Sequence, residues 1–251
     1  MTPQCASAKR AAFETGRLSP EDLRVFRPGG LELTGRALAL AELSSGARVL
    51  DLGCGTGATL SYLESRGVVA VGVDCSPEAR SGHDQEADPR RIVASAEKLP
   101  FADETFDGVL LECTLSLIED QAQALAECAR VLVDGGRLVI SDLYARRPEA
   151  IEHVRTLSGC CAAGMLLREE LAATLGQAGF DVEVWEDHSR ALRECAARYI
   201  FEHGSTDGLW NCGGQAVDTI DTAMRSARAG YFLMVARRQD RVRQKGYLYE
   251  R

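Results

Sequence analysis

The sequence predicts an α/β fold in which a doubly wound, mostly parallel sheet of seven strands carries helices on both faces. Three observations lead to this class. Short apolar runs alternate with segments of helical periodicity, as in parallel strands joined by crossover helices. Several of these runs are continuously apolar, which is typical of strands buried on both faces. A glycine-rich turn, "GCGTG", ends the first run. Together these features predict a Rossmann-like sheet.

The first half of the sheet is predicted from five consecutive segments. "ARVLDLG" (47–53) is a buried strand, and "TGATLSYLESRG" (56–67) is the helix that follows it. "VVAVGVD" (68–74) is a second buried strand. "RIVASAEKLPF" (91–101) begins with a short third strand and continues as a loop. "FDGVLLECTLSLI" (106–118) is a fourth strand that enters a loop.

The second half of the sheet follows the same alternation. "DQAQALAECARVL" (120–132) places apolar residues at helical spacing. "VDGGRLVISDLY" (133–144) is a turn followed by a strand, and "LREELAATLGQAGF" (167–180) is a helix. "DVEVWED" (181–187) alternates as a strand, and "YFLMVARR" (231–238) is the last strand.

The length predicts one domain with additions to its core. The chain has 251 residues, of which 45% are hydrophobic, enough for one α/β domain. We expect a single domain over residues 1–251. Residues 1–45 form an N-terminal helical cover, and residues 46–188 form the ligand-binding core. Residues 189–229 form a helical insertion before the last strand, and residues 230–251 form that strand and a tail.

Composition excludes several classes of protein. The formal net charge is −8 and no stripe of Lys and Arg is present, which argues against a nucleic-acid partner. No apolar run reaches about 18 residues, so we expect no membrane span. The first residues lack the apolar stretch of a signal peptide, so we expect a cytoplasmic location. Nine cysteines without regular spacing predict reduced thiols. The sequence does not indicate an oligomeric state.

The glycine turn and the end of the next strand predict a nucleoside-binding edge. Ligands of open parallel sheets lie outside the carboxyl ends of the strands, where Gly53, Gly55 and Gly57 are expected. Glycine permits left-handed backbone and close approach of a ligand. Asp74 ends the second strand, at a position from which a carboxylate can accept both ribose hydroxyls.

Two nucleosides fit this turn. Gly53, Gly55 and Ala58 match the G-x-G-x-x-A fingerprint of a dinucleotide, whereas the segment Asp51–Gly57 matches D-x-G-x-G-x-G, typical of a methyl-donor site. Asp51 is a poor neighbour for a diphosphate and a good partner for an ammonium group. S-adenosylmethionine has an ammonium and no phosphate, so the turn favours this ligand over NAD. An NAD-linked oxidoreductase is the disfavoured alternative.

From Ala47 to Tyr144 the chain resembles class I S-adenosylmethionine-dependent methyltransferases of the broad type 11 family, which includes ubiquinone and menaquinone C-methyltransferases. Four motifs carry this resemblance: VLDLGCGTG (49–57), VGVDCSP (71–77), SAEKLPFADETFD (95–107) and ECARVLVDGGRLVISD (127–142). The chain departs from the family at Ser95, where an Asp commonly contacts the adenine amino group. A Ser hydroxyl can still accept that hydrogen bond, without the charge.

The resemblance implies S-adenosylmethionine as the cofactor and a set of residues that bind it. These are Asp51, Gly53, Cys54, Gly55, Thr56, Gly57, Asp74, Cys75, Ser95, Ala96, Glu97, Glu112 and Cys113. The turn would line the methionine end of the donor, Asp74 would hold the ribose, and the segment 95–97 would flank the adenine. Glu112 and Cys113 would lie beside the reactive methyl group. Arg27 is either a counter-ion for the donor's carboxylate or part of a helix-capping turn.

The methyl acceptor leaves alternatives open. The candidates for catalysis are Glu112, Cys113 and Cys161, and the four histidines lie in no recognisable catalytic motif. Cys113 and the pair Cys160-Cys161 partly resemble the metalloid-binding thiols of arsenite methyltransferases, and soft thiolates do select thiophilic centres. The same cysteines are also consistent with small packed residues, and we predict no metal site.

The function predicted from the sequence is therefore S-adenosylmethionine-dependent methylation of a small molecule. One alternative is thiol-assisted methylation of a metalloid such as arsenite. The other is a non-catalytic module that only binds S-adenosylmethionine.

Overall fold

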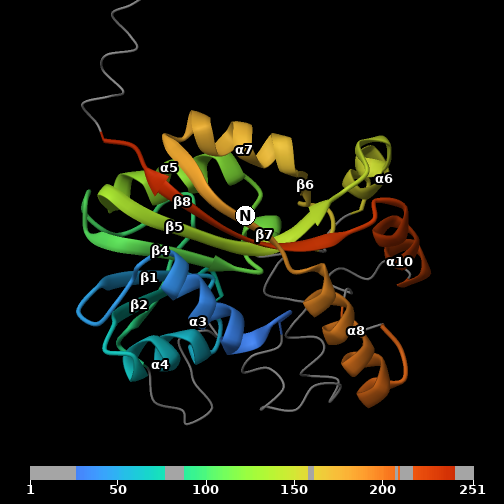
Figure 1. The fold of residues 1–251 in the computed structure, drawn as a ribbon, viewed down its shortest axis with the longest axis horizontal. Helices are drawn as coiled ribbons and strands as arrows, with labels where there is room; N and C mark the ends of the chain where they lie inside the picture. Colours follow the sequence, from blue (N-terminus) through green and yellow to red (C-terminus); the bar gives the residue numbers. More distant parts are fainter. Residues whose placement is uncertain (1–26, 77–87, 158–160, 207–208, 210–216, 241–251) are drawn as a thin grey trace, which may run out of the picture.

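The computed structural model describes residues 27–76, 88–157, 161–206, 209 and 217–240, and within them it contains one mixed sheet (Figure 1). The strand order is β3-β2-β1-β4-β5-β8-β7, and β6 pairs with β5 beside this path. The predicted α/β class is confirmed, and the seven predicted strands form the path. The expected count of seven is too low by one, because β6 (Leu166–Leu167) has two residues and shows no periodicity.

The first half of the sheet is parallel throughout. Its strands are β1 (Arg48–Leu52), β2 (Val69–Asp74), β3 (Arg91–Val93) and β4 (Phe106–Glu112). β1 pairs with β2 on one side and with β4 on the other. The strand order therefore reverses next to β1, and such a switch point is where open parallel sheets bind ligands.

The second half of the sheet contains the only change of direction among the described strands. β5 (Leu132–Ala145) runs parallel to β4. β8 (Gly230–Arg238) is antiparallel both to β5 and to β7 (Phe180–Asp187). β8 therefore brings the start of the last strand to the edge where the parallel strands end.

Helices cover both faces of the sheet. Figure 1 shows α5 (Gln121–Val131) and α7 (Arg168–Gln177) on one face, and α3 (Gly30–Leu40) and α4 (Ala58–Ser65) on the other. Each face has its own cluster of buried apolar side chains. The sheet strands supply residues with no exposed surface to both clusters, for example Val49 to one and Leu50 to the other.

Further helices gather beyond the carboxyl ends of the parallel strands, on the right of Figure 1. They are α6 (Ile151–Arg155), α8 (Ser189–His203) and α10 (Val217–Ser226). The last two lie in the segment predicted as a helical insertion, and α3 lies in the predicted N-terminal cover. Within the described residues, no helix is long and apolar enough to cross a membrane.

Candidate functional site

The glycine turn, residues 53–57, connects β1 to α4 in left-handed backbone. Gly53, Gly55 and Gly57 have φ of 84°, 50° and 84°, and Gly57 is the N-cap of α4. The amides of Gly53 and Cys54 donate to the carbonyl of Val73, at 2.7 and 3.1 Å. The turn is thus fastened to the end of β2 by main-chain bonds, and its shape depends on glycine.

Gly55 is the glycine of the turn that faces open space. No atom lies within 4 Å of the position that a Cβ at Gly55 would take. A Cβ at Gly53 would instead collide with the side chain of Thr114. Cys54 turns its side chain toward Gly72 in the core, where burial raises the pKa of its thiol. Only the main chain of Cys54 therefore remains at this edge.

Asp74 lies beside Gly55 at the end of β2. One carboxylate oxygen accepts the amide of Gly55 at 2.9 Å, and the other accepts the amide of Ser76 at 2.9 Å. A carboxylate has about four lone-pair sites, so both oxygens can each accept one further hydroxyl. Cys75 follows it with an exposed side chain, and partial desolvation of the thiol together with the charge of Asp74 raises the pKa of Cys75.

The segment 95–97 reaches the same edge after β3. The amide of Ala94 donates to the carbonyl of Asp74 at 3.1 Å, which places the following residues beside β2. The Ser95 hydroxyl donates to the carboxylate of Glu97, and the Glu97 amide returns to that hydroxyl at 3.3 Å. Ala96 is half-buried between them.

Two further residues of the predicted donor set differ in exposure. Asp51 is 3% exposed within β1, between Gly72 of β2 and Leu110 of β4. Thr56 is exposed, and its carbonyl accepts from the Arg91 guanidinium at 3.1 Å. The structure therefore brings all of the predicted donor residues on β1, β2 and β3 to one edge.

Glu112 ends β4 in a buried polar network that the sequence did not suggest. Its carboxylate accepts from the hydroxyls of Thr34 at 2.8 Å and Thr59 at 3.0 Å, and it pairs with Arg27 at 2.8 Å. The side chains of Arg27 and Glu112 are 11% and 5% exposed. Arg27 also donates to Thr34, at 2.6 Å. Arg27, one candidate counter-ion for the donor's carboxylate, is thus paired with Glu112 in this structure.

Cys113 follows Glu112 in left-handed backbone, with φ of 54°. Its amide donates to the carbonyl of Ser141, and its sulfur lies 3.0 Å from the hydroxyl of Tyr231. Tyr231 is fully buried at the start of β8, and burial raises the pKa of its hydroxyl well above the ordinary range. The thiol of Cys113 is thus hydrogen-bonded within the fold.

Cys161 lies in the turn 161–164, which packs on the residues that follow Cys113. A Cβ at Gly164 would collide with the backbone of Ser116. Cys113 and Cys161 both border the same buried cluster. Cys160 lies outside the described residues. In the described ranges, no group of three or more His, Cys, Asp or Glu side chains is placed to hold a metal ion.

The described histidines do not gather at this edge. His188 bonds to Glu186 at 3.0 Å, and His153 is exposed on α6. His203 lies in the last turn of α8 beside Tyr199, with ring centroids 4.3 Å apart. His83 lies outside the described residues.

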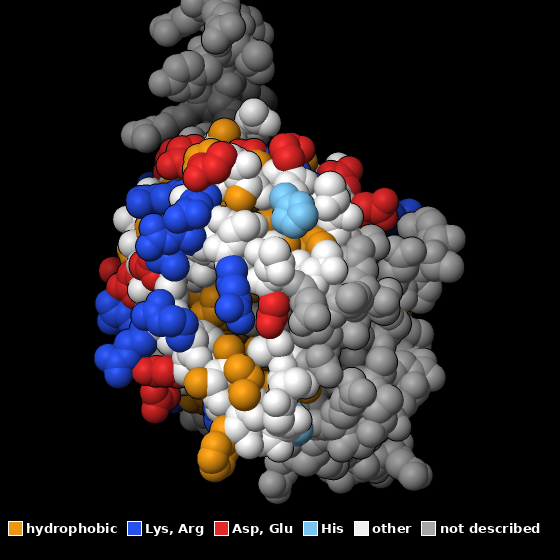
Figure 2. Space-filling model, turned by 90° about the vertical axis from the view of Figure 1, so that its right-hand side faces the viewer, with side chains coloured by type: hydrophobic (Ala, Val, Ile, Leu, Met, Phe, Trp, Pro, Cys, Tyr) orange, Lys and Arg blue, Asp and Glu red, His pale blue; other side chains and the backbone are white. Residues whose placement is uncertain are grey.

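A hollow of about 510 Å³ separates the start of α3 from α8. Its lining residues are Arg27, Gly29, Gly30, Leu31, Glu32, Ala191, Glu194, Cys195 and Arg198. Sites for small molecules occupy about 300–1,000 Å³, so the hollow has the size of one. Figure 2 looks onto the side of the molecule where α6, α8 and α10 lie, and shows apolar side chains near its centre and basic side chains gathered on one part.

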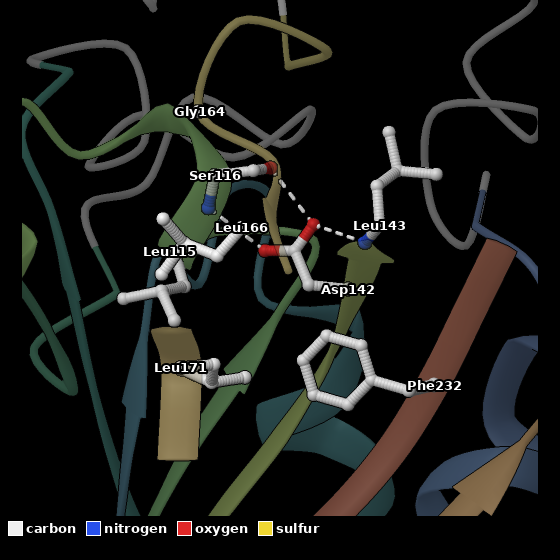
Figure 3. Close-up of a pocket in the computed structure, with 8 residues that line it drawn as sticks. All are labelled: Leu115, Ser116, Asp142, Leu143, Gly164, Leu166, Leu171 and Phe232. Carbon is white, nitrogen blue, oxygen red and sulfur yellow. Dashed lines mark hydrogen bonds between the residues drawn. The ribbon is translucent and has the colours of Figure 1, made fainter. Parts of the chain in front are cut away.

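A second, much smaller cavity of about 10 Å³ lies at the end of β5 (Figure 3). Its polar side chains are Ser116 and Asp142, and Asp142 is 2% exposed. Leu115, Leu171 and Phe232 are among the apolar side chains around it. Sequence reasoning missed Asp142, although an acidic residue that ends a buried apolar run is a visible signal.

Comparisons with known proteins agree with this geometry. The family described as "Methyltransferase domain" matches residues 50–140. The chain is 33% identical over 156 residues to O-methyltransferase resE of Aspergillus sclerotiorum, covering 57% of this chain and 58% of the relative. It is 32% identical over 154 residues to O-methyltransferase rstn1 of Aspergillus nomiae, covering 57% of this chain and 68% of the relative.

A solved structure shows the same fold. Haemonchus contortus phosphoethanolamine N-methyltransferase 2, in complex with S-adenosyl-L-methionine, superposes with a TM-score of 0.67 at 18% identity. The superposition covers 96% of this chain and 61% of that chain. The chain thus spans little more than half the length of several of the proteins that it matches.

Proposed function

The chain belongs to the class I S-adenosylmethionine-dependent methyltransferases, and from that premise we propose that it transfers a methyl group from S-adenosylmethionine to a small organic molecule. One observation carries the proposal. The left-handed glycine turn leaves Gly55 facing open space, and the carboxylate of Asp74 lies beside it with acceptor capacity to spare.

The residues at this edge fit the donor. A Cβ at Gly55 would occupy the open space, so glycine leaves room for a ligand close to the backbone. We assign Asp74 to the ribose hydroxyls, the 95–97 segment to the adenine, and Asp51 with the glycine turn to the methionine end. The sequence resemblance and the shared edge support these assignments.

Arg27 supports a further part of the donor site. Its Nε is buried and has no hydrogen-bond partner within the described part of the chain, although its terminal nitrogen is bonded to Glu112 and Thr34. The Nε–H is therefore left for a carboxylate. We assign Arg27 to the carboxylate of the donor or of the acceptor.

S-adenosylmethionine supplies an activated methyl group on a sulfonium sulfur. The protein then has mainly to align the acceptor atom and to exclude water, because positioning alone gives a large rate advantage. Glu112 supports this task by fixing Arg27, Thr34 and Thr59 around one buried carboxylate. We therefore assign Glu112 to the organisation of the site rather than to proton transfer.

The hollow between α3 and α8 is the proposed acceptor site. Arg27 lines it, and Arg27 also bonds to Glu112 at the end of β4. Arg27 thus connects the lining of the hollow to the end of β4, where the reactive methyl group is assigned. Its size supports a small molecule, and the names of two relatives favour oxygen as the acceptor atom. The acidic net charge supports a partner other than nucleic acid, and we keep a single domain acting in the cytoplasm as a further proposal.

We do not extend the proposal to arsenite. The Cys113 sulfur is hydrogen-bonded to Tyr231, and no observation of the described residues favours a metalloid. The other alternative is a module that binds the donor without catalysis. Only a measurement of turnover distinguishes it from the proposed methyltransferase.

The proposal is tested in two steps. Isothermal titration calorimetry with S-adenosylhomocysteine and with NAD measures which nucleoside binds, and we expect binding of the first and no heat from the second. A panel of phenols, carboxylic acids and amines is then incubated with S-adenosylmethionine, and formation of S-adenosylhomocysteine is followed. Binding of NAD alone contradicts the donor assignment. Donor binding without turnover on any panel member favours the non-catalytic module.

A further inference from the structure

The loop that follows β4, residues 113–117, lies between two turns that belong to different parts of the site. We call it the strand-four loop. On one side, the side chain of Thr114 occupies the space over Gly53 of the glycine turn. On the other side, the backbone of Ser116 packs directly on Gly164 of the 161–164 turn. No side chain fits at either glycine, so the loop touches both turns without a gap.

A buried carboxylate holds this loop from below. Asp142 accepts the Ser116 amide at 2.9 Å, the Ser116 hydroxyl at 2.8 Å and the Leu143 amide at 2.7 Å (Figure 3). The bonds from Ser116 cross from η2 (Leu115–Leu117) to the end of β5. Both oxygens of Asp142 are used, one for the Ser116 amide and one for the other two donors.

A second set of hydrogen bonds connects the same loop to the 161–164 turn. The side-chain amide of Gln121, at the start of α5, donates to the carbonyl of Leu115 at 3.1 Å and to the carbonyl of Gly164 at 3.0 Å. Gln121 links the two segments to each other, whereas Asp142 links the loop to the sheet. Cys113, at the start of the loop, is bonded to Ser141 and Tyr231 of the sheet, and Asp142 holds Ser116, farther along the loop. The position of the Ser116 part of the loop therefore depends on Asp142.

A charge at this place is costly, because Asp142 is 2% exposed. Apart from Ser116, the side chains that line the cavity around Asp142 are apolar, and an isolated charge there costs several kcal/mol unless hydrogen bonds compensate it. Burial raises the pKa of Asp142, and the hydrogen bonds from Ser116 and Leu143 act in the opposite direction. An apolar residue would avoid this cost but would leave the Ser116 amide without a partner.

We infer that Asp142 is a positioning residue for methyl transfer: its buried carboxylate fixes the strand-four loop between the glycine turn and the 161–164 turn. The inference rests on the proposed function, which assigns the glycine turn to the donor. We place the 161–164 turn on the acceptor side, because it carries Cys161, a catalytic candidate from the sequence. Through Thr114 the loop limits the space at Gly53, and through Ser116 it limits the position of the 161–164 turn. Asp142 thus sets the separation of the two sides without touching either ligand.

The test uses the full chain and two variants. Asp142→Asn places an amide nitrogen where one oxygen accepts a donor, and Ser116→Ala removes only the hydroxyl bond. The control is Asp107→Asn, because Asp107 also accepts a backbone amide, that of Arg48 at 2.8 Å, but at the opposite edge of the sheet. Hydrogen–deuterium exchange of the peptide containing residues 113–117, and calorimetric affinity for S-adenosylhomocysteine, are measured below the unfolding temperature of every variant.

We expect Asp142→Asn to accelerate exchange in the strand-four loop about tenfold, with exchange in β1 and α5 unchanged, because opening is local. We expect the affinity for S-adenosylhomocysteine to fall about fivefold, because Thr114 of the loop contacts Gly53 of the glycine turn. Ser116→Ala gives a smaller change of both, and the control gives neither. If the panel supplies an acceptor, kcat falls more than the donor KM rises.

Three results overturn the inference. They are unchanged exchange in the loop, unchanged affinity in a variant whose loop has opened, and exchange that rises uniformly through the chain. Failure of the wild type to bind S-adenosylhomocysteine would instead overturn the proposed function, and the exchange data would still decide whether Asp142 holds the loop.

Discussion

The two sides of the site are built in different ways. On the proposed donor side, the ends of β1, β2 and β3 offer three left-handed glycines, main-chain amides and the carboxylate of Asp74. On the proposed acceptor side, side-chain contacts join the end of β4 to distant segments, among them the pair Glu112–Arg27, which reaches the residues before α3, and the pair Cys113–Tyr231, which reaches the start of β8. The donor side thus depends on local conformation, and the acceptor side depends on contacts between distant segments.

This difference decides how each side responds to substitution. A donor-side change alters a backbone shape or removes a single acceptor, so it affects binding before it affects the fold. An acceptor-side change breaks a buried network and leaves its partners unsatisfied, so it affects the fold as well. Four predictions separate these responses, in order of decreasing expected effect.

The largest effect is expected for Gly55→Val. A branched side chain at φ of 50° is strained and fills the open space assigned to the donor. We expect the affinity for S-adenosylhomocysteine, measured by calorimetry, to fall about 100-fold or more, a free-energy change of roughly 3 kcal/mol. The control is Gly46→Val, since Gly46 has φ of 88° and equally open surroundings in the turn before β1. Equal loss of affinity in both variants would mean that backbone strain, not occupied space, explains the effect.

The next effect is expected on stability. Arg27→Met leaves the buried carboxylate of Glu112 without its ionic partner, and breaking such a pair costs about 3 kcal/mol of the free energy of unfolding. Chemical denaturation measures this change. Arg36→Met is the control, because Arg36 pairs with Glu186 at the exposed surface and should leave stability nearly unchanged. Similar stability of the two variants would show that the Arg27–Glu112 pair does not anchor the start of α3.

Asp74→Ala tests the donor side with a smaller change. It removes a charged acceptor from the two ribose hydroxyls and from the amides of Gly55 and Ser76, so we expect donor binding to weaken by about 1.5–3 kcal/mol. Asp74→Asn should lie between this variant and the wild type. Asp107→Ala, which loses an amide acceptor at the opposite edge, should bind the donor normally. An unchanged dissociation constant for Asp74→Ala would exclude the ribose assignment.

The glycine turn and the place of Asp74 beside it could be predicted from the sequence because this information is local. Glycines, a strand-ending carboxylate and an apolar run specify the turn, its position and its neighbour within a few residues of each other. The fold class followed from the same alternation of apolar runs and helices. The two-residue strand β6 could not be predicted, since a strand of that length exists only through its pairing with Tyr144 and Ala145.

The acceptor side could be predicted only in part. Glu112 and Cys113 were found because they end a strand, but their partners Thr34 and Tyr231 lie 78 and 118 residues away in the chain. No periodicity encodes such pairs. The left-handed backbone of Cys113 could not be predicted from the sequence either, because cysteine has no preference for it and the surrounding bonds impose it.

The smallest expected effect concerns the left-handed backbone of Cys113. It is tested by the sign of the stability difference between the glycine and the alanine variants. At ordinary helical positions glycine is less stable than alanine by about 1 kcal/mol. Cys113 has φ of 54°, where a Cβ costs about 1–2 kcal/mol, so Cys113→Gly should be more stable than Cys113→Ala. Both variants lose the sulfur contact with Tyr231, which cancels in the comparison. Cys128 is the matched control, since it is fully buried inside α5, and there glycine should be the less stable replacement. Denaturation of the four variants measures both differences. The same order at both positions would mean that the end of β4 carries no backbone strain, and the acceptor side would then differ from the donor side in its side chains alone.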